Sequence, residues 1–213
     1  CPDYKDCFVM LARREAMAAD LVVVNHHLFF ADVMLRDEGM AELLPACNTV
    51  IFDEAHQLPE VATLFFGSTV SSAQMLDLAR DARAEGLLNA RDCLDLQDGS
   101  RKMEKVAKDL RLAAGVDTGR FSAPQLEERA EFLPALAALQ EELQRFGSLL
   151  EDQAQRSEGL EKCWQRALEL SAGLAAWRNP AGAGFVRWGE AFQQSLQLNL
   201  TPLDVAEIFR KQM

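Results

Sequence analysis

Two carboxylates and a histidine directly follow a short apolar run in the segment Val50 to His56 (VIFDEAH). A run of β-branched and aromatic residues predicts a buried parallel strand, and open α/β sheets bind ligands beyond the carboxyl ends of such strands. A carboxylate at that edge can hold Mg²⁺, and a second one can orient a water molecule for attack on a phosphoryl group. We expect Asp53 to fill the first role and Glu54 the second. The alternative for an arbitrary Asp-Glu pair is an acidic turn in solvent.

The full pattern Asp53-Glu54-Ala55-His56 after an apolar strand favours a nucleotide-hydrolysing box of the Walker B or DEAH type. The sequence contains no Gly-x-x-x-x-Gly-Lys-Ser/Thr loop, whose backbone would cradle the phosphates. We therefore expect half of a nucleotide site, which on its own neither binds ATP tightly nor hydrolyses it.

Cysteines provide a second candidate site. Cys1 and Cys7 flank a short polar segment that contains a proline, as a ligand loop would, but a closed metal or cluster site needs four ligands. A zinc site that adds His26 and His27 is a further hypothesis. Adjacent side chains at a strand end point to opposite faces, which argues against it.

The remaining cysteines, Cys47, Cys93 and Cys163, are isolated in sequence, and we expect each to be a small buried hydrophobe. An odd total of five does not favour a secreted disulfide framework, so a reducing cytoplasm is the expected location. No run of about 18 apolar residues predicts a membrane span, and no secretory signal opens the chain. The chain begins at Cys1 without an initiator methionine, and we expect it to be an internal piece of a longer protein.

A net charge of −11 argues against a surface that binds nucleic acid throughout, so any such contact must be local. The best candidate is a basic set spaced to fall on one side of a helix. Its members are Arg101, Lys102, Lys105, Lys108 and Arg111. Glu104 and Asp109 are interspersed, which fits the alternative of an ordinary solvated helix face.

Periodicity predicts two kinds of region. Up to Gly67, helices and buried strands alternate. We expect helices over 7–19 and 28–35 and from Pro59 to about Phe66, and strands over 21–24 and 50–52.

After Gly67 helix-forming residues dominate for roughly a hundred residues, which predicts an all-helical insertion. The expected helices run from a Ser71/Gln74 capping box to Ala84, across 103–110 to a stop at Gly115, from Ser122 past Pro124 with a kink or split at Pro134, and across 160–177. Strands over 185–188 and 196–200 and a short helix from Pro202 follow.

Four features in chain order resemble the iron–sulfur superfamily 2 DNA helicases of the XPD and DinG type, most closely their bacterial DinG-like branch. They are Cys1 to Cys7, 19–26 (ADLVVVNH), 50–56 (VIFDEAH) and 201–205 (TPLDV). The helical stretch between the last two resembles the family's arch domain.

The resemblance implies an α/β fold: part of a RecA-like P-loop helicase motor domain with a large all-α insertion. It divides the chain into the end of an iron–sulfur domain (1–19), part of motor domain 1 with the DEAH box (20–67), an arch-like insertion (68–182) and a return to motor domain 1 (183–213). A Ser-Ala-Thr motif, a second motor domain and two further cluster cysteines, which the full family pattern includes, are absent from the sequence.

The resemblance also implies roles for single residues. Cys1 and Cys7 would be two of the four ligands of a [4Fe-4S] cluster. Asp53 would hold Mg²⁺, Glu54 would position the attacking water, and His56 would couple the ATP site to DNA. The implied activity is ATP-dependent 5′ to 3′ movement on single-stranded DNA with unwinding of forked duplexes, in DNA repair or replication and with a protein partner from those processes.

A hypothesis from another class stays open beside this one. The helical region could be a protein-interaction module in which the DEAH residues are inert, because an acidic surface suits a basic protein partner better than DNA.

Overall fold

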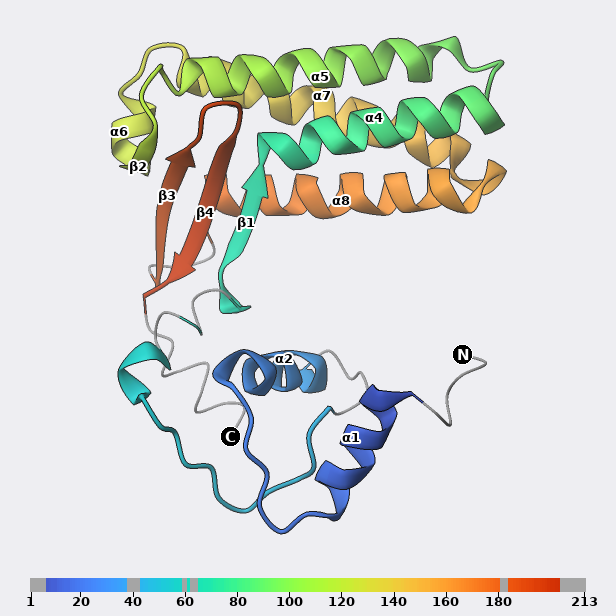
Figure 1. Ribbon diagram of the computed structural model, residues 1–213. Coiled ribbons are helices and arrows are strands. Elements are labelled where there is room, and N and C mark those ends of the chain that lie inside the picture. Colours follow the sequence, from blue (N-terminus) through green and yellow to red (C-terminus); the bar gives the residue numbers. More distant parts are fainter. Residues whose placement is uncertain (1–6, 38–42, 59–60, 62–64, 181–183, 204–213) are drawn as a thin grey trace. The chain divides into compact units, whose positions relative to one another are not determined.

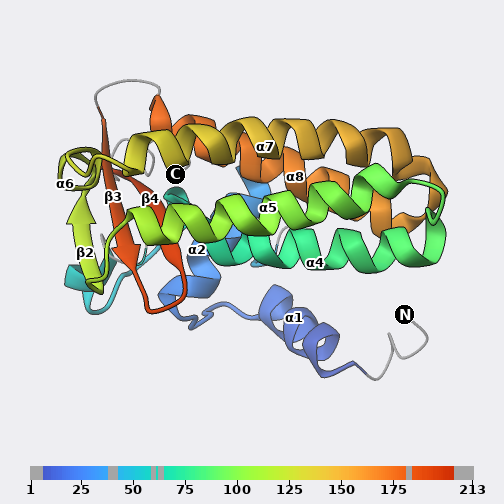
Figure 2. The ribbon, with the colours of Figure 1, turned by 90° about the horizontal axis from the view of Figure 1, so that it is seen from above.

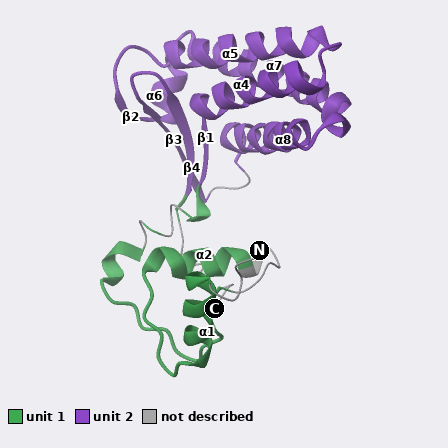
Figure 3. Ribbon diagram, turned by 45° about the vertical axis from the view of Figure 1, so that its right-hand side comes forward, with its two compact units in different colours: residues 1–67, 202–213 green, residues 68–201 purple. Residues whose placement is uncertain are grey.

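The chain divides into two compact units, unit 1 with residues 1–67 and 202–213 and unit 2 with residues 68–201 (Figure 3). The structure, a computed structural model, describes residues 7–37, 43–58, 61, 65–180 and 184–203. No helix among these residues is long and apolar enough to cross a membrane.

Unit 1 contains helices α1 (Phe8–Ala18) and α2 (His26–Asp37) and the 3₁₀ turn η1 (Ala55–Gln57) (Figure 1). The first two confirm the helices expected over 7–19 and 28–35. Helix α2 begins earlier than its apolar pattern because the side-chain oxygen of Asn25 accepts a hydrogen bond of 2.7 Å from the Leu28 N–H, as an N-cap does. The small buried core of this unit centres on Phe30 and Val61.

The strands expected over 21–24 and 50–52 are not formed, and both segments are extended chain without a ladder. Alternate apolar side chains in them are exposed: Leu21 by 80%, Val23 by 88% and Ile51 by 86%. A parallel strand requires hydrogen bonds from neighbouring strands, and the described part of unit 1 has no other strand. The structure therefore does not confirm a RecA-like sheet. The helix expected from Pro59 begins outside the described residues.

Unit 2 is built around four long helices, and successive helices run in opposite directions (Figures 1 and 2). Each packs against two others, in the cyclic order α4, α5, α7, α8. Their bounds are α4 (Ser72–Asn89), α5 (Leu94–Ala113), α7 (Phe132–Gln153) and α8 (Glu158–Arg178), with the short helix α6 (Ala123–Glu127) before α7 and the 3₁₀ turn η2 (Ala154–Arg156) after it. The short connections from α4 to α5 and from α7 to α8 favour antiparallel neighbours.

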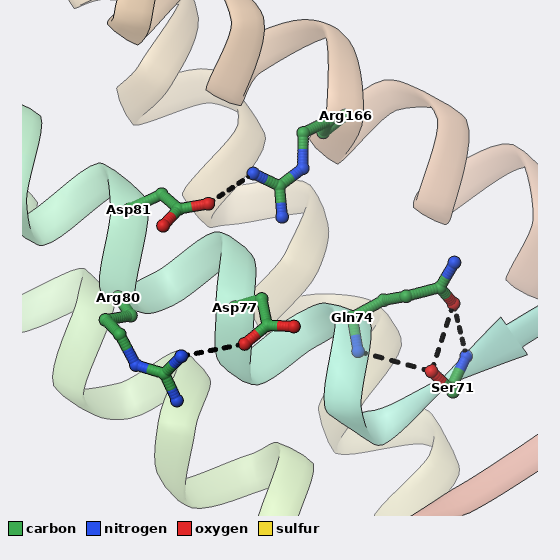
Figure 4. Close-up of polar contacts among 6 residues, drawn as sticks. All are labelled: Ser71, Gln74, Asp77, Arg80, Asp81 and Arg166. Atoms are coloured by element: carbon green, nitrogen blue, oxygen red, sulfur yellow. Dashed lines mark hydrogen bonds and ion pairs between the residues drawn. The ribbon is translucent and has the colours of Figure 1, made fainter.

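Local capping signals fix where these helices begin and end. The predicted capping box is present, since Ser71 Oγ accepts from the Gln74 N–H and Gln74 Oε1 accepts from the Ser71 N–H at 2.8 Å (Figure 4). Gly115 has a φ of +88°, the left-handed conformation that ends α5 as expected. The predicted third helix is split, but the break lies before Pro134, between α6 and α7. Pro134 itself lies in the first turn of α7, where its missing N–H costs little.

Unit 2 is not all helical, which corrects the predicted insertion. It contains a four-stranded sheet of order β1-β4-β3-β2. Its strands are β1 (Ser68–Ser71), β2 (Gly119–Ser122), β3 (Phe185–Ala191) and β4 (Leu196–Pro202), with β1 antiparallel to β4 and β2 antiparallel to β3. The expected strands over 185–188 and 196–200 are present.

Strand β3 pairs with β2, and β4 pairs with β1, so β3 and nearly all of β4 belong to unit 2 together with its helices. The sequence had instead predicted that the chain returns to the first unit at residue 183. Thr201 and Pro202 end β4 rather than start a helix, and residues 204–213 lie outside the described part.

The sheet and the bundle share one core, and Trp177 of α8 joins them. Its Nε1–H donates to the carbonyl oxygens of Trp188 on β3 (3.3 Å) and Asn199 on β4 (3.2 Å). The ring is 1% exposed and meets Phe132 of α7 edge-on, with 6.3 Å between ring centroids.

Ion pairs between helices complete the bundle. Arg166 of α8 donates to Asp81 of α4 (Figure 4). Arg156 of η2 donates two hydrogen bonds to the carboxylate of Asp92, which precedes α5. These hydrogen bonds lower the pKa of the Asp92 carboxyl group.

We predict that Trp177→Phe lowers the free energy of unfolding by roughly 1–3 kcal/mol, because two carbonyl oxygens inside the fold lose a donor. Trp164→Phe is the matched control: it removes a ring of the same size, and its buried Nε1 has no hydrogen-bond partner in the structure. Denaturant unfolding followed by circular dichroism measures both. Equal losses in the two variants would show that ring volume, not the shared hydrogen bond, stabilises the sheet.

Candidate functional site

The Asp53-Glu54-Ala55-His56 box forms a tight turn. Asp53 Oδ1 accepts a hydrogen bond of 2.9 Å from the Glu54 N–H, and the Glu54 carbonyl accepts one of 2.9 Å from Gln57 N–H, which begins η1. Glu54 has φ +49° and ψ +42°, the left-handed region that a glutamate rarely adopts. Strained backbone of this kind is concentrated at functional sites.

The turn places its side chains in solvent. His56 Nδ1 lies 3.3 Å from Glu54 Oε2, and the two side chains are 73% and 62% exposed. Asp53 is exposed as well. An exposed pair of this kind contributes little stability, so the geometry leaves both carboxylates available to a ligand.

Aromatic contacts hold the turn against the start of α2. The Phe52 ring meets Phe29 edge-on at 5.1 Å and lies 6.2 Å from the His26 ring, centroid to centroid. The C-terminal end of segment 50–52 therefore lies beside the residues that follow segment 21–24, although neither segment is a strand. Asp32, which is buried on α2, anchors the chain that leads to the box, since its Oδ1 accepts from the N–H groups of Leu43 and Leu44.

The described residues contain no group of three or more His, Cys, Asp or Glu side chains placed to hold a metal ion. Two adjacent exposed carboxylates suit Mg²⁺ that arrives with a phosphate ligand and keeps several waters, because magnesium is bound in this way more often than in an all-protein cage. The site can thus hold a cation and orient water only when a ligand completes it.

The cysteine site is not assembled within the described residues. Cys7 is a free, half-buried thiol at the N-cap of α1, and Cys1 lies outside the described range. One thiol does not fit a four-ligand cluster by itself. His26 and His27 face different rings, Phe52 and Phe65 respectively, an arrangement that gives no support to a shared zinc site.

The other cysteines differ from one another. Cys163 is buried, and burial raises the pKa of its thiol to about 11. Cys93 is half-buried against the core of unit 2. Cys47 is exposed, so its expected burial is wrong, because the chain around it forms no packed element.

The predicted basic set lies on α5, where Arg101, Lys102, Lys105 and Lys108 are all exposed. Arg101 pairs with Asp98 at 3.1 Å, and Lys108 Nζ lies 3.9 Å from Glu104. The interspersed acids therefore offset part of the positive charge, as the alternative of a solvated face expects.

Arg111 does not belong to this surface, although its spacing suggested that it does. It is buried, and its guanidinium donates to the carbonyl oxygens of Gly115 and Phe192, both at 2.6 Å. It therefore caps the end of α5 and ties it to the turn between β3 and β4. An arginine in the last turn before a helix-ending glycine is the signal that could have indicated this role.

No family model matches the chain. The chain is 37% identical over its full length to the ATP-dependent DNA helicase YoaA of Escherichia coli and 35% identical to that of Haemophilus influenzae. It spans about a third of the length of these two relatives. Over 52% of the chain it is 31% identical to the ATP-dependent helicase DinG of Mycobacterium tuberculosis, of which that match covers 16%.

The left-handed backbone at Glu54 gives a prediction for stability. Both Glu54→Gly and Glu54→Ala remove the side chain, but only glycine adopts this conformation without a steric cost of about 1 kcal/mol. We expect Glu54→Gly to be the more stable variant in denaturant unfolding, by up to about 1 kcal/mol after its larger loss of chain entropy.

The same exchange at Gln57, inside η1, provides the control, since alanine should be the better residue there. A Glu54→Ala variant more stable than Glu54→Gly would contradict a strained turn at the box.

Proposed function

This chain belongs to the family of the YoaA and DinG helicases, and we propose that it is the part of an ATP-dependent DNA helicase that carries the DEAH box. The observation that carries the proposal is the box itself: two exposed carboxylates in a strained turn, in a chain similar over its whole length to DNA helicases. The helicase couples ATP hydrolysis to 5′ to 3′ movement on single-stranded DNA and to unwinding of forked duplexes, in DNA repair or replication.

Each residue of the box has a role in this proposal. Asp53 holds Mg²⁺ through a carboxylate oxygen, and its second contact, to the Glu54 N–H, fixes the turn. Glu54 orients the water that attacks the γ-phosphoryl group of bound ATP. His56 lies 3.3 Å from the Glu54 carboxylate, so it is placed to sense the charge there and to couple the ATP site to DNA.

The rest of the motor would complete the site. Leu21, Val23 and Ile51 present β-strand-forming side chains to solvent beside the box, a pattern that suits burial in a sheet supplied by a longer chain. The relatives are about three times as long as this chain. A phosphate-binding loop is absent from the sequence, and the 213 residues alone should therefore show no DNA-stimulated ATPase activity.

We assign Cys1 and Cys7 to a [4Fe-4S] cluster as two of four thiolate ligands. Support comes from the resemblance at the start of the sequence and from the half-buried free thiol of Cys7, not from an assembled site. The iron–sulfur domain then ends near α1, residues 20–67 belong to motor domain 1, and unit 2 takes the place of the arch. Arg101, Lys102, Lys105 and Lys108 are a further, charge-based contact to DNA.

A protein-interaction role for unit 2 is the second candidate. A groove of about 490 Å³ between α5 and α7 is lined by apolar side chains with Asp109 and Glu131 among them, and Leu112 beside it is 73% exposed. An apolar groove with acidic members suits a basic amphipathic helix.

The catalytic assignment predicts a separation of binding from chemistry. In the longer helicase, Glu54→Gln should keep ATP affinity near that of the parent, because Asp53 and the phosphate loop remain, but should abolish hydrolysis and unwinding. Nucleotide titration and a forked-duplex unwinding assay measure the two effects. Gln57→Glu is a control that leaves the box unchanged. Unwinding at the parent rate by Glu54→Gln would remove Glu54 from the chemistry.

The cluster assignment predicts that Cys7→Ser lowers the iron content of the longer helicase purified without oxygen. Cys47→Ser is the matched control, because Cys47 is an exposed and isolated thiol. Iron analysis and the visible absorbance of the cluster report the outcome. Equal iron in Cys7→Ser and in the parent would exclude Cys7 as a ligand.

A further inference from the structure

One face of the unit 2 sheet has a composition that neither the core nor the DEAH box explains. Strand alternation puts Gly189 and Ala191 of β3 on the side of the helices, where a Cβ at Gly189 would lie 2.6 Å from Leu126 of α6. Trp188 and Glu190, which alternate with these two residues along β3, therefore lie on the opposite face. Their partners across the β2–β3 ladder are Ser122 and Arg120.

Trp188 and Arg120 form a stacked pair on this face. The Arg120 guanidinium carbon lies 5.2 Å from the centroid of the Trp188 ring. The ring is fixed in place, because Trp188 Nε1–H donates a hydrogen bond of 3.0 Å to Thr201 Oγ1 of β4. A depression of about 270 Å³ beside the pair is lined by Arg120, Phe121, Ser122 and Trp188.

Arg120, which lines the depression, is available to a ligand. Arg120 is 74% exposed, and its one ion pair, to Glu190 at 3.3 Å, is of the surface kind that contributes little. Phe121 pairs with Gly189 and so faces the helices, where the Arg129 guanidinium carbon lies 4.5 Å from the centroid of its ring. This second pair therefore does not belong to the face that carries Trp188.

Aromatic and guanidinium planes that lie side by side suit unpaired nucleobases. Every base has a flat face that stacks on such rings, and a guanidinium can also bind a phosphate oxygen with two hydrogen bonds. Bases in a duplex cannot offer that face. The four exposed basic side chains on α5 could supply positive charge to a nucleic acid, but they include no aromatic ring on which a base could stack.

We propose that Trp188 and Arg120 form a stacking site for a base of single-stranded DNA, with Arg120 exchanging Glu190 for the adjacent phosphate. The proposal rests on the proposed helicase function for its choice of DNA, because the relatives are named DNA helicases. The contact depends on the base face and is therefore independent of sequence.

The test compares two oligonucleotides of about 12 nucleotides, within the usual range of single-strand sites, one of thymidine and one with abasic sugars throughout. Binding to the 213-residue chain is measured by fluorescence anisotropy. The parent should bind the thymidine strand more tightly. Trp188→Ala should weaken that binding by roughly fivefold or more and leave the abasic strand unaffected, whereas Trp188→Phe should retain most of the preference.

Arg120→Ala should weaken binding of both strands, since it removes a phosphate contact as well as a stacking plane. Arg80→Ala is the matched control: Arg80 is 72% exposed and pairs with Asp77 at 2.9 Å, as Arg120 pairs with Glu190, but no aromatic ring contact is found for it in the described structure (Figure 4). It should bind like the parent. Melting temperatures check that each variant is folded.

Equal affinity of the parent for the two strands, or unchanged binding by Trp188→Ala, would overturn the stacking site, as would the absence of binding to either strand. None of these results bears on Glu54, whose role is measured separately by ATP hydrolysis in the longer helicase. Failure of the stacking site and failure of the proposed function are therefore distinguishable.

Discussion

The buried N–H of Trp177 is the interaction on which the architecture of unit 2 depends. It is shared between carbonyl oxygens of β3 and β4, and so it ties helix α8 to both central strands at once. Leaving this buried donor unpaired would cost free energy, which restricts how the sheet can slide along the bundle. Because β4 pairs with β1, and β1 leads into the capped first turn of α4, the same constraint reaches the opposite side of the bundle. The outer strand β2 is placed through β3.

Unit 1 lacks a comparable constraint, and the box is organised by short-range contacts instead. The turn is set by hydrogen bonds among neighbours in sequence, and Phe52 seats it on the aromatic side chains of α2. Local contacts of this kind fix the backbone of Glu54 without enclosing its side chain. The carboxylates of Asp53 and Glu54 therefore stay exposed to solvent.

Sequence predicted best the features that have local causes. The Ser71/Gln74 box, the stop at Gly115 and the amphipathic stripe that includes Leu136, Leu139 and Leu143 need only residues within a few turns of one another. Strands were harder to predict, because their partners are distant. Strand β1 is four residues long and carries a single large apolar side chain, Val70, so its own sequence does not indicate a strand. Segments 21–24 and 50–52 have the composition of strands, but they pair with no strand among the described residues.

The same distinction applies to the candidate sites. The candidate DEAH box is contiguous in sequence and could be proposed from its residues alone, whereas Arg120 and Trp188 are separated by 67 intervening positions and meet only because β2 pairs with β3. Spacing also misassigned Arg111, since helical periodicity places a side chain on a face without saying what covers that face. A contiguous motif can therefore suggest a chemistry from sequence alone, whereas side chains that only a long-range ladder brings together cannot be grouped without the structure. Charge patterning pointed to α5, whereas in the described part of the chain the arginine that stacks on an exposed-face tryptophan, Arg120 on Trp188, belongs to the sheet.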